Sequence, residues 1–427
     1  MNIAFIFSII IFIAALAMVI AKPRGIDIGY SSLIWALVTI ILGLITLEQV
    51  VEVLDIVWNA TLTFVSVVII SLIFDESGVF HHLAIKLMKL SKGSGTRLFI
   101  YVIILGTFIS AIFANDGTAL VLTPIIISLL YRAGFREKSI IAYVMAVGFI
   151  ADSASLPLLV SNLVNIIAAG YFDISFFSYM EAMLIPDLVS VLASLALLYI
   201  IYRKEIKGDF KWDITMEEDL IKDKLIFRLF YPVIVSLVIL YSIGGFFNVP
   251  ISFVAIPMAI LLVYLSRRGG NVDYVKVLKE APWQIIIFSI GMYIVVYSLA
   301  AHGLSSYMVL ALDYFSTFPP WISFILSGYL FAFTASVMNN LPSVLLGDLA
   351  LKAGHFSGYI VLTNAIGNDI GPKFTPIGSL ATLVWLYMIR RKSGIAIKTT
   401  EYVKIGLLVG IPVLTLSLLS LYLETLI

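Results

Sequence analysis

Four charged residues lie deep inside apolar stretches of the 427-residue chain, where charges are costly and are usually kept for a function. They are Asp116, Asp152, Asp369 and Lys373, and no other formal charge is expected at this depth. A carboxylate that is removed from water can alternate between a charged and a protonated form. We therefore expect Asp116, Asp152 and Asp369 to carry protons, in that order of preference. Lys373 is expected to form an ion pair with Asp369. The alternative to a role of this pair in transport is that it only stabilises the unwound backbone.

Amide and hydroxyl side chains accompany these charges at four interruptions of the apolar pattern. Half-helices that meet at such interruptions leave backbone N–H and C=O groups free to face a cavity. Together with the polar side chains, these groups suit an ion or a neutral solute that carries several hydroxyl groups. We expect the solute to be bound by Asn115, Asn162, Asn339, Asn340 and Ser379.

Several kinds of chemistry are excluded by what the sequence lacks. It contains no cysteine, which excludes disulfides, thiolate metal sites and cysteine nucleophiles. It also lacks the glycine-rich nucleotide-binding motif and the common metalloprotease and serine hydrolase motifs. We therefore expect no cofactor, no metal and no enzymatic activity, and we interpret His81 and His82 as a solvated helix end. A net charge of +1 gives no reason to expect a nucleic-acid partner.

The composition places most of the chain in a lipid bilayer. Hydrophobic residues make up 61% of the sequence and charged residues only 12%, whereas a soluble chain is nearer half apolar and a quarter charged. A soluble enzyme, a nucleic-acid binder and a disordered scaffold are thereby excluded. A membrane helix needs about 20 apolar residues. We expect ten spans, at 2–21, 31–47, 53–74, 138–170, 180–201, 229–247, 250–266, 281–301, 357–390 and 402–426.

Two further apolar stretches, 98–131 and 320–351, carry polar residues at their middles and are interpreted as re-entrant hairpins. Polar turns are excluded from lipid at mid-depth, which favours hairpins that are buried in protein. With this topology, 25 of the 27 Lys and Arg residues fall on one side of the membrane, and two full spans in place of each hairpin would give the same count. Because cytoplasmic loops collect basic residues, we expect both termini outside the cytoplasm.

The two halves of the chain repeat the same order of elements. Each half has three spans, an amphipathic stretch, a hairpin, an interrupted long helix and a last span. Because five spans is an odd number, the second half is inverted relative to the first. We expect an inverted repeat in which 1–202 is the first repeat, 203–228 a cytoplasmic linker and 229–427 the second repeat. An all-α polytopic protein with two hairpins and helices broken at the midplane has the plan of a secondary transporter.

Four blocks of sequence resemble the ArsB-type arsenite efflux permeases of the ion transporter superfamily. They are WNATLTF at 58–64, FANDG with LTP at 113–124, ADSASLPLLVSNLVNI at 151–166 and GNDIGPKFTPIGSLATLVWL at 367–386. The resemblance implies a cell-membrane protein, built from a scaffold domain and a transport domain, that exports arsenite and antimonite from the cytoplasm in exchange for protons. Some members of the family work with a cytosolic ArsA-type ATPase, so the resemblance leaves such a partner open.

The alternative function is a sodium- or proton-coupled carrier of small organic anions from the same superfamily. Such carriers typically have Ser-Asn-Thr at both helix breaks, whereas this sequence has Ser161-Asn162-Leu163 and Gly378-Ser379-Leu380. A passive channel and a membrane-embedded enzyme that uses Asp152 and Asp369 are further alternatives. Without cysteine, recognition of a metalloid hydroxide has to rely on hydrogen bonds.

Overall fold

The computed structural model describes residues 3–210 and 221–426, which form helices joined by short connections. The first half contains α1 (Ile3–Ala21), α2 (Ile28–Ile41), α3 (Leu47–Glu76), α4 (Val79–Leu90), α5 (Gly95–Phe113), α6 (Asn115–Arg132), α7 (Glu137–Ser153), α8 (Leu163–Tyr171) and α9 (Phe176–Tyr202). The second half contains α10 (Lys224–Phe246), α11 (Ser252–Gly269), α12 (Tyr274–Glu280), α13 (Trp283–Leu299), α14 (Ser305–Ser316), α15 (Pro320–Met338), α16 (Asn340–Ala353), α17 (Leu362–Ile370), α18 (Leu380–Ser393) and α19 (Thr399–Glu424). Within the described residues the only β-type contact is a single bridge between Ser94 and Asp209, so the predicted all-helical class is confirmed.

Nine helical segments in the described part of the chain are long and apolar enough to cross a membrane. Seven of them coincide largely with spans that the sequence predicts, and the other two, α5 and α15, are the first arms of the predicted hairpins. The remaining predicted spans are shorter or broken. α2 has only 14 residues, and the segments 138–170 and 357–390 are each divided into two helices.

Both hairpins turn at a single residue with a positive φ angle. α5 and α6 meet at Ala114, whose φ and ψ are 69° and 142°. α15 and α16 meet at Asn339, whose φ and ψ are 77° and 146°. Residues other than glycine seldom adopt positive φ. The same uncommon backbone at the same place in both halves therefore depends on tertiary packing rather than on local preference.

The two interrupted helices also restart in the same way. α7 ends at Ser153, and helix resumes after Asn162, whose φ and ψ are −151° and 143°. α17 is followed by a 3₁₀ turn at Gly371–Phe374, and α18 starts after Ser379, whose φ and ψ are −143° and 142°. Each break contains proline, which cannot donate a helical hydrogen bond. As a result, a second half-helix begins at a buried residue in each half.

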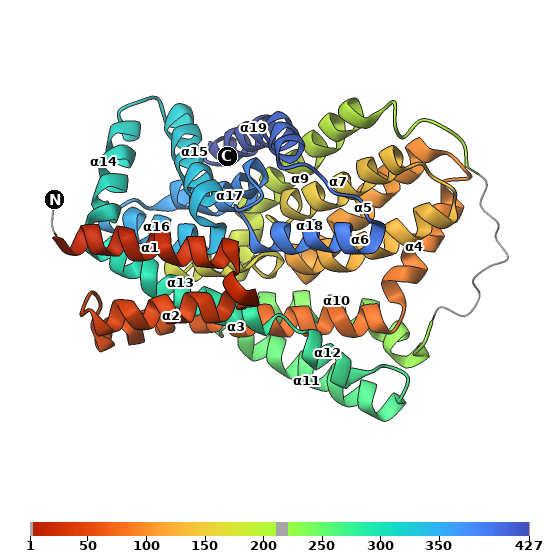
Figure 1. Cartoon of the computed structure of the whole chain (residues 1–427), viewed down its shortest axis with the longest axis horizontal. Helices are drawn as coiled ribbons and strands as arrows, with labels where there is room; N and C mark the ends of the chain where they lie inside the picture. The colour runs from red at the N-terminus through yellow and green to blue at the C-terminus, as the bar shows by residue number, and fades with distance from the viewer. Residues whose placement is uncertain (1–2, 211–220, 427) are drawn as a thin grey trace.

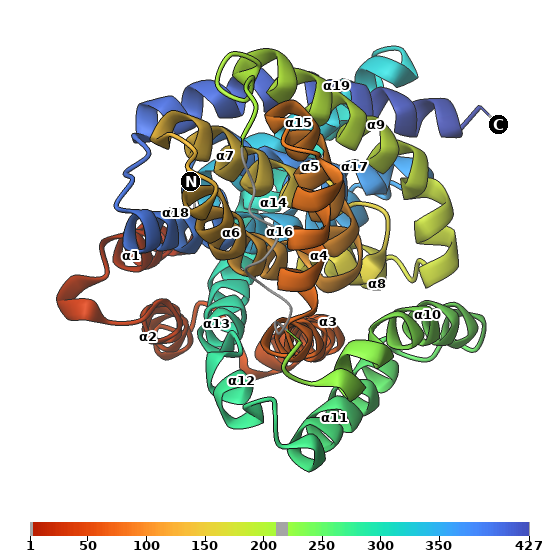
Figure 2. The same ribbon diagram turned by 90° about the vertical axis from the view of Figure 1, so that its right-hand side faces the viewer.

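The helices form two groups, with the hairpins and broken helices largely between them. Figure 2 shows α2, α3, α10, α11, α12 and α13 on one side and α9, α15 and α19 on the other, and the same separation is visible in Figure 1. Within the groups, α2 packs on α13 and α9 packs on α19. α16 connects the groups, because it contacts both α13 and α15, while α8 contacts α3 of the first group and the broken helix α17.

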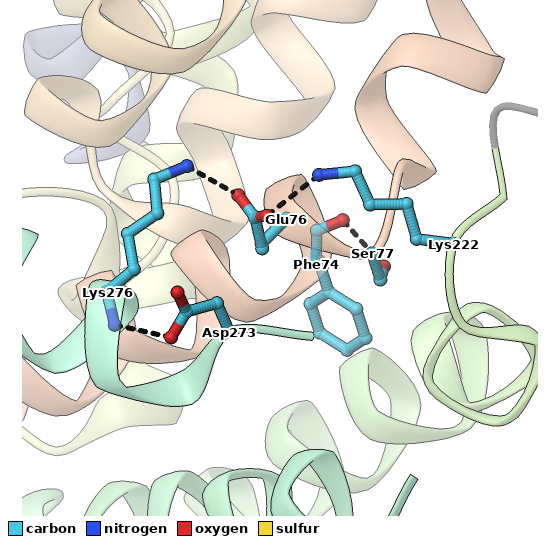
Figure 3. A network of polar contacts seen from close by, with 6 residues as sticks. All are labelled: Phe74, Glu76, Ser77, Lys222, Asp273 and Lys276. Carbon is cyan, nitrogen blue, oxygen red and sulfur yellow. Dashed lines mark hydrogen bonds and ion pairs between the residues drawn. The ribbon is translucent and has the colours of Figure 1, made fainter. Parts of the chain in front are cut away.

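An ion-pair network fixes the end of the predicted linker to α3 (Figure 3). The Glu76 carboxylate accepts hydrogen bonds from Lys222 Nζ at 2.7 Å and from Lys276 Nζ of α12 at 2.8 Å. The Lys222 backbone N–H also donates to the Ser77 carbonyl at 3.0 Å. Both lysines are about half exposed, so each ion pair contributes about 1 kcal/mol or less to the stability of the fold. Residues 211–220 of the linker lie outside the described residues.

Candidate functional site

Both hairpin tips contact the helix break of their own half. At the first tip the Asn115 side-chain amide donates to Asp152 Oδ1 at 3.0 Å. At the second tip the Asn340 backbone N–H donates to the Gly378 carbonyl at 2.9 Å. The first tip is therefore anchored to the last turn of α7, and the second tip to the non-helical backbone directly before α18.

Asp369 joins the two broken helices to each other. Its side chain is 1% exposed. Oδ1 accepts a hydrogen bond from the Asn162 side-chain amide at 2.5 Å, and Oδ2 accepts one from the Ser155 hydroxyl at 3.3 Å. Both donors belong to the break of the first half, so an acid of the second repeat is held by the first. Among the described residues, neither Asp369 nor Asp152 has a basic side chain within 4 Å.

The ammonium group of Lys373 contacts a hydroxyl group instead of a carboxylate. Its side chain is fully buried, and Nζ donates to Ser153 Oγ, which lies 2.6 Å from Ser194 Oγ. The predicted ion pair with Asp369 is therefore not formed in the described part of the chain. Residues four apart are neighbours in an α-helix, but the 3₁₀ turn that begins at Gly371 separates Lys373 from Asp369.

Two buried acids lie outside the set predicted from the sequence. Asp187 of α9 is 7% exposed and accepts a hydrogen bond from the Leu156 backbone N–H at 3.3 Å. Asp348 of α16 is 0% exposed and accepts one from the Asn364 side chain at 2.8 Å. The expectation that only four charges lie deep in the apolar segments is therefore wrong. Both acids lie inside predicted segments, 180–201 and 320–351, so counting every ionisable residue there would have found them.

Lys373 interacts electrostatically with three carboxylates, those of Asp152, Asp187 and Asp369. We call these four residues the central cluster. If all four were ionised, the cluster would carry an excess of two negative charges. Because a buried charge without a partner is strongly unfavourable, such a cluster favours the binding of a cation or a proton.

The structure divides the five predicted solute-binding residues into two groups. Three of them already bind protein groups through their side chains, namely Asn115, Asn162 and Asn339. Asn340 and Ser379 are 5% and 2% exposed, and their side chains have no hydrogen-bond partner among the described residues. The Asn340 backbone N–H donates to the carbonyl of Gly378, the residue before Ser379. The side chains of Asn340 and Ser379 therefore extend from neighbouring segments of backbone. Solute binding by the five residues stays a prediction.

The space beside Asp152 is small. A cavity of about 10 Å³ lies against Asp152 and is also lined by Thr382, Trp385 and Tyr402. A single water molecule needs about 10–15 Å³, so a metalloid hydroxide would not fit into this cavity beside Asp152. Two larger cavities, of about 700 and 270 Å³, are lined by none of the predicted site residues.

Asp116, the residue preferred from the sequence as proton carrier, can be placed only by its backbone. It belongs to the first turn of α6, directly after the first hairpin tip. Its side chain lies outside the described part of the structure. Its role as a proton carrier therefore stays a prediction.

A metal site is not indicated by the described side chains. Within 3–210 and 221–426, no three His, Asp or Glu side chains are grouped closely enough to hold a metal ion. The His82 ring packs edge-on against Phe227, with ring centroids 5.1 Å apart. Partial burial and the charges of Lys86 and Lys89 lower the pKa of His82, which favours its neutral form near pH 7.

Gly406 of α19 allows this helix to approach the second helix break. A β-carbon at Gly406 would overlap the Lys373 carbonyl oxygen, a backbone atom that cannot move alone. We expect Gly406→Ala to destabilise the purified protein by about 1–3 kcal/mol or more, measured as a lower midpoint of thermal unfolding. Gly170→Ala is the matched control, because nothing lies within 4 Å of the added carbon there. Equal midpoints for the two variants would contradict this packing argument.

Comparison with known proteins gives matches over nearly the whole chain. The family model described as "Arsenical pump membrane protein" (ArsB) matches residues 7–425. An arsenical pump membrane protein of Escherichia coli is 40% identical over 419 residues, which cover 97% of each chain. A putative arsenical pump membrane protein of Bacillus subtilis is 25% identical, and the alignment covers 96% of this chain and 97% of the relative.

Two solved transporter structures resemble the fold. YdaH of Alcanivorax borkumensis matches with a TM-score of 0.55 at 15% identity, over 88% of each chain. MtrF of Neisseria gonorrhoeae matches with a TM-score of 0.56 at 11% identity, over 88% of this chain and 84% of MtrF. At these identities the likeness concerns the fold alone, and it agrees with the polytopic helical plan predicted from the sequence.

Proposed function

The chain belongs to the arsenical pump membrane protein (ArsB) family, and we propose that it exports arsenite and antimonite from the cytoplasm in exchange for protons. Family membership makes it an arsenical efflux transporter of the lipid bilayer. The observation that carries the finer proposal is the central cluster, in which one ammonium group interacts with three carboxylates, and one of these, Asp152, accepts a hydrogen bond from the first hairpin tip. Such a cluster can exchange protons while neutral polar groups next to it bind a neutral solute.

The proposed solutes are the neutral hydroxides of arsenic and antimony. Arsenous acid is uncharged near pH 7 and offers hydroxyl groups as donors and acceptors. The chain has no cysteine, so thiolate ligands are excluded and hydrogen bonds must provide recognition. The free side chains of Asn340 and Ser379 are suited to this role. Asn115, Asn162 and Asn339 would join them once a change of conformation releases their present partners.

Protons are proposed as the coupling ion because a neutral solute gains nothing from the membrane potential by itself. One proton that moves inward supplies about 2.3 kcal/mol per 100 mV. We propose Asp116, Asp152 and Asp369 as the carriers. The hydrogen bonds of Asp152 and Asp369 to neutral partners support these two, since a carboxyl group that is not fixed in an ion pair is free to gain and lose a proton.

The proposed topology places both termini outside the cytoplasm, with inverted repeats at 1–202 and 229–427 around the linker 203–228. The distribution of Lys and Arg supports the orientation. The shared backbone conformations of Ala114 and Asn339 support the repeat. A cytosolic ArsA-type ATPase would meet the basic cytoplasmic side, and transport without ATP would make such a partner dispensable.

Everted membrane vesicles that contain the protein test this proposal. We would impose a proton gradient without ATP or sodium and measure uptake of arsenite and antimonite, with an uncoupler in a parallel sample. We expect accumulation that the uncoupler abolishes. Vesicles without the protein are the control for leakage and adsorption.

Two other outcomes would replace the proposal with an alternative. Uptake of small organic anions that follows a sodium gradient, without uptake of arsenite, would favour the organic-anion carrier. The central cluster contains one basic side chain, that of Lys373, and three acidic ones, which disfavours the binding of an anionic solute. Equilibration of arsenite that is independent of any gradient would favour a passive channel.

A further inference from the structure

A second buried polar cluster lies between α16 and α17. Asp348 Oδ1 accepts a hydrogen bond from the Asn364 side-chain amide at 2.8 Å, and Asn364 Oδ1 accepts one from the Asn368 side-chain amide at 2.8 Å. All three side chains are completely buried. This chain of hydrogen bonds runs from the second arm of the second hairpin to the residue directly before Asp369.

Asp348 has no counter-ion among the described residues. Its second carboxylate oxygen, Oδ2, has no hydrogen-bond partner there. Lys352, one turn further along α16, is directed to the Tyr171 ring of α8, with Nζ 4.8 Å from the ring centroid. The titratable groups that interact with Asp348 are Tyr171 and Tyr293 of α13, and neither is a cation. No other charged group acts on Asp348 from the helices around it.

The packing around Asp348 leaves little space for a metal cation. A β-carbon on the adjacent Gly347 would overlap the Asn364 side chain, so α16 and α17 are in close contact at this level. None of the three cavities described above is lined by Asp348. A metal cation needs several oxygen ligands around it, whereas a proton needs only one carboxylate oxygen.

We propose that Asp348 is a second proton-binding site, supported by Asn364 and Asn368 and separate from the central cluster. The proposal rests on the proposed proton coupling, which it extends from one site to two. A proton on Asp348 removes the cost of a buried, unpaired charge and stabilises the packing of α16 on α17. Release of the proton to water loosens this packing, and the tip of the same hairpin is bonded to Gly378 at the second break. Only an O–H bond of the carboxyl group forms and breaks.

Infrared spectroscopy of the reconstituted full chain tests the site without any transport. A protonated carboxyl group has a C=O stretch that carboxylates and amides do not share. We expect the protonated-carboxyl band at neutral pH to lose a component in Asp348→Asn and to keep that component in Asp313→Asn, a matched control on the exposed face of α14. An unchanged band in Asp348→Asn would overturn the proposal. If that variant does not fold, Asp348→Glu keeps an ionisable group and should move the same component, and an unmoved band would overturn the proposal.

Transport distinguishes a coupling role from a structural one. In everted vesicles we expect Asp348→Asn to reduce proton-driven arsenite accumulation to the level reached with the uncoupler. A wild-type response to the proton gradient would overturn the coupling role. The coupling role would also be overturned if a sodium gradient drove arsenite uptake and Asp348→Asn removed that uptake, because Asp348 would then bind sodium and not a proton. Failure of the proposed function would be recognised differently. Wild-type vesicles would then accumulate no arsenite, while the infrared band of Asp348 would still be lost in Asp348→Asn.

Discussion

Replacement of Asp369 by asparagine is expected to abolish proton-driven accumulation of arsenite without unfolding the protein. Asp369 accepts hydrogen bonds from Asn162 and Ser155 of the other broken helix. An asparagine keeps both contacts, because its oxygen accepts from Asn162 and its amide donates to the Ser155 hydroxyl, which is also an acceptor. It cannot take up a proton, however. The substitution therefore removes one ionisable group and preserves the link between the two halves.

The expected loss of accumulation by Asp369→Asn is large. One proton exchanged for one neutral solute supplies about 2.3 kcal/mol at 100 mV, which corresponds to a concentration ratio of roughly 50. Vesicles with Asp369→Asn should only equilibrate arsenite, while the exposed-site variant Asp313→Asn should accumulate it normally. A wild-type ratio in Asp369→Asn would exclude Asp369 as the carrier. Asp116 and Asp152 would then remain, and the same substitution tests each of them.

The positions of the helix interruptions could be predicted from the sequence because polar residues and prolines mark them, although the backbone conformation of the turns could not. The hairpin tips at Ala114 and Asn339 lie within the polar middles of the two apolar stretches. The breaks before Asn162 and Ser379 each contain proline, which cannot donate a helical hydrogen bond. The length and apolar character of the segments then predict most of the spans.

The contacts among the site residues could not be predicted because they join positions that are far apart in the sequence. Asn162 and Asp369 are 207 residues apart, and Lys373 and Ser153 are 220 apart. The ion pair expected between Asp369 and Lys373 rested on their opposite charges in the same broken segment, whereas the fold directs Lys373 to Ser153 of the other half. Asp187 lies within a predicted span, so its depth could be predicted, but only the fold brings it to Leu156 and near Lys373.

Replacement of Lys373 by methionine is expected to destabilise the protein and to abolish transport. Methionine has a similar length but no charge, so Asp152, Asp187 and Asp369 would be left in a buried cluster without a cation. Removing one partner of a buried charge interaction typically costs about 3–5 kcal/mol. We would measure unfolding of the purified protein by heat or denaturant. Lys352→Met is the matched control, because the Lys352 side chain is exposed and lies over the Tyr171 ring, a contact worth about 0.5–1 kcal/mol.

Combining Lys373→Met with Asp187→Asn is expected to restore part of the lost stability. Either single variant changes the balance of charge in the cluster, whereas the double variant removes one charge of each sign. Residues that interact in this way show a coupling energy of about 0.5–3 kcal/mol in a double-mutant cycle. If the effects of the two substitutions on the free energy of unfolding are strictly additive, Asp187 and Lys373 do not interact. Transport should stay absent in the double variant even where stability recovers, because we expect proton exchange at Asp152 and Asp369 to require the ammonium group that interacts with both.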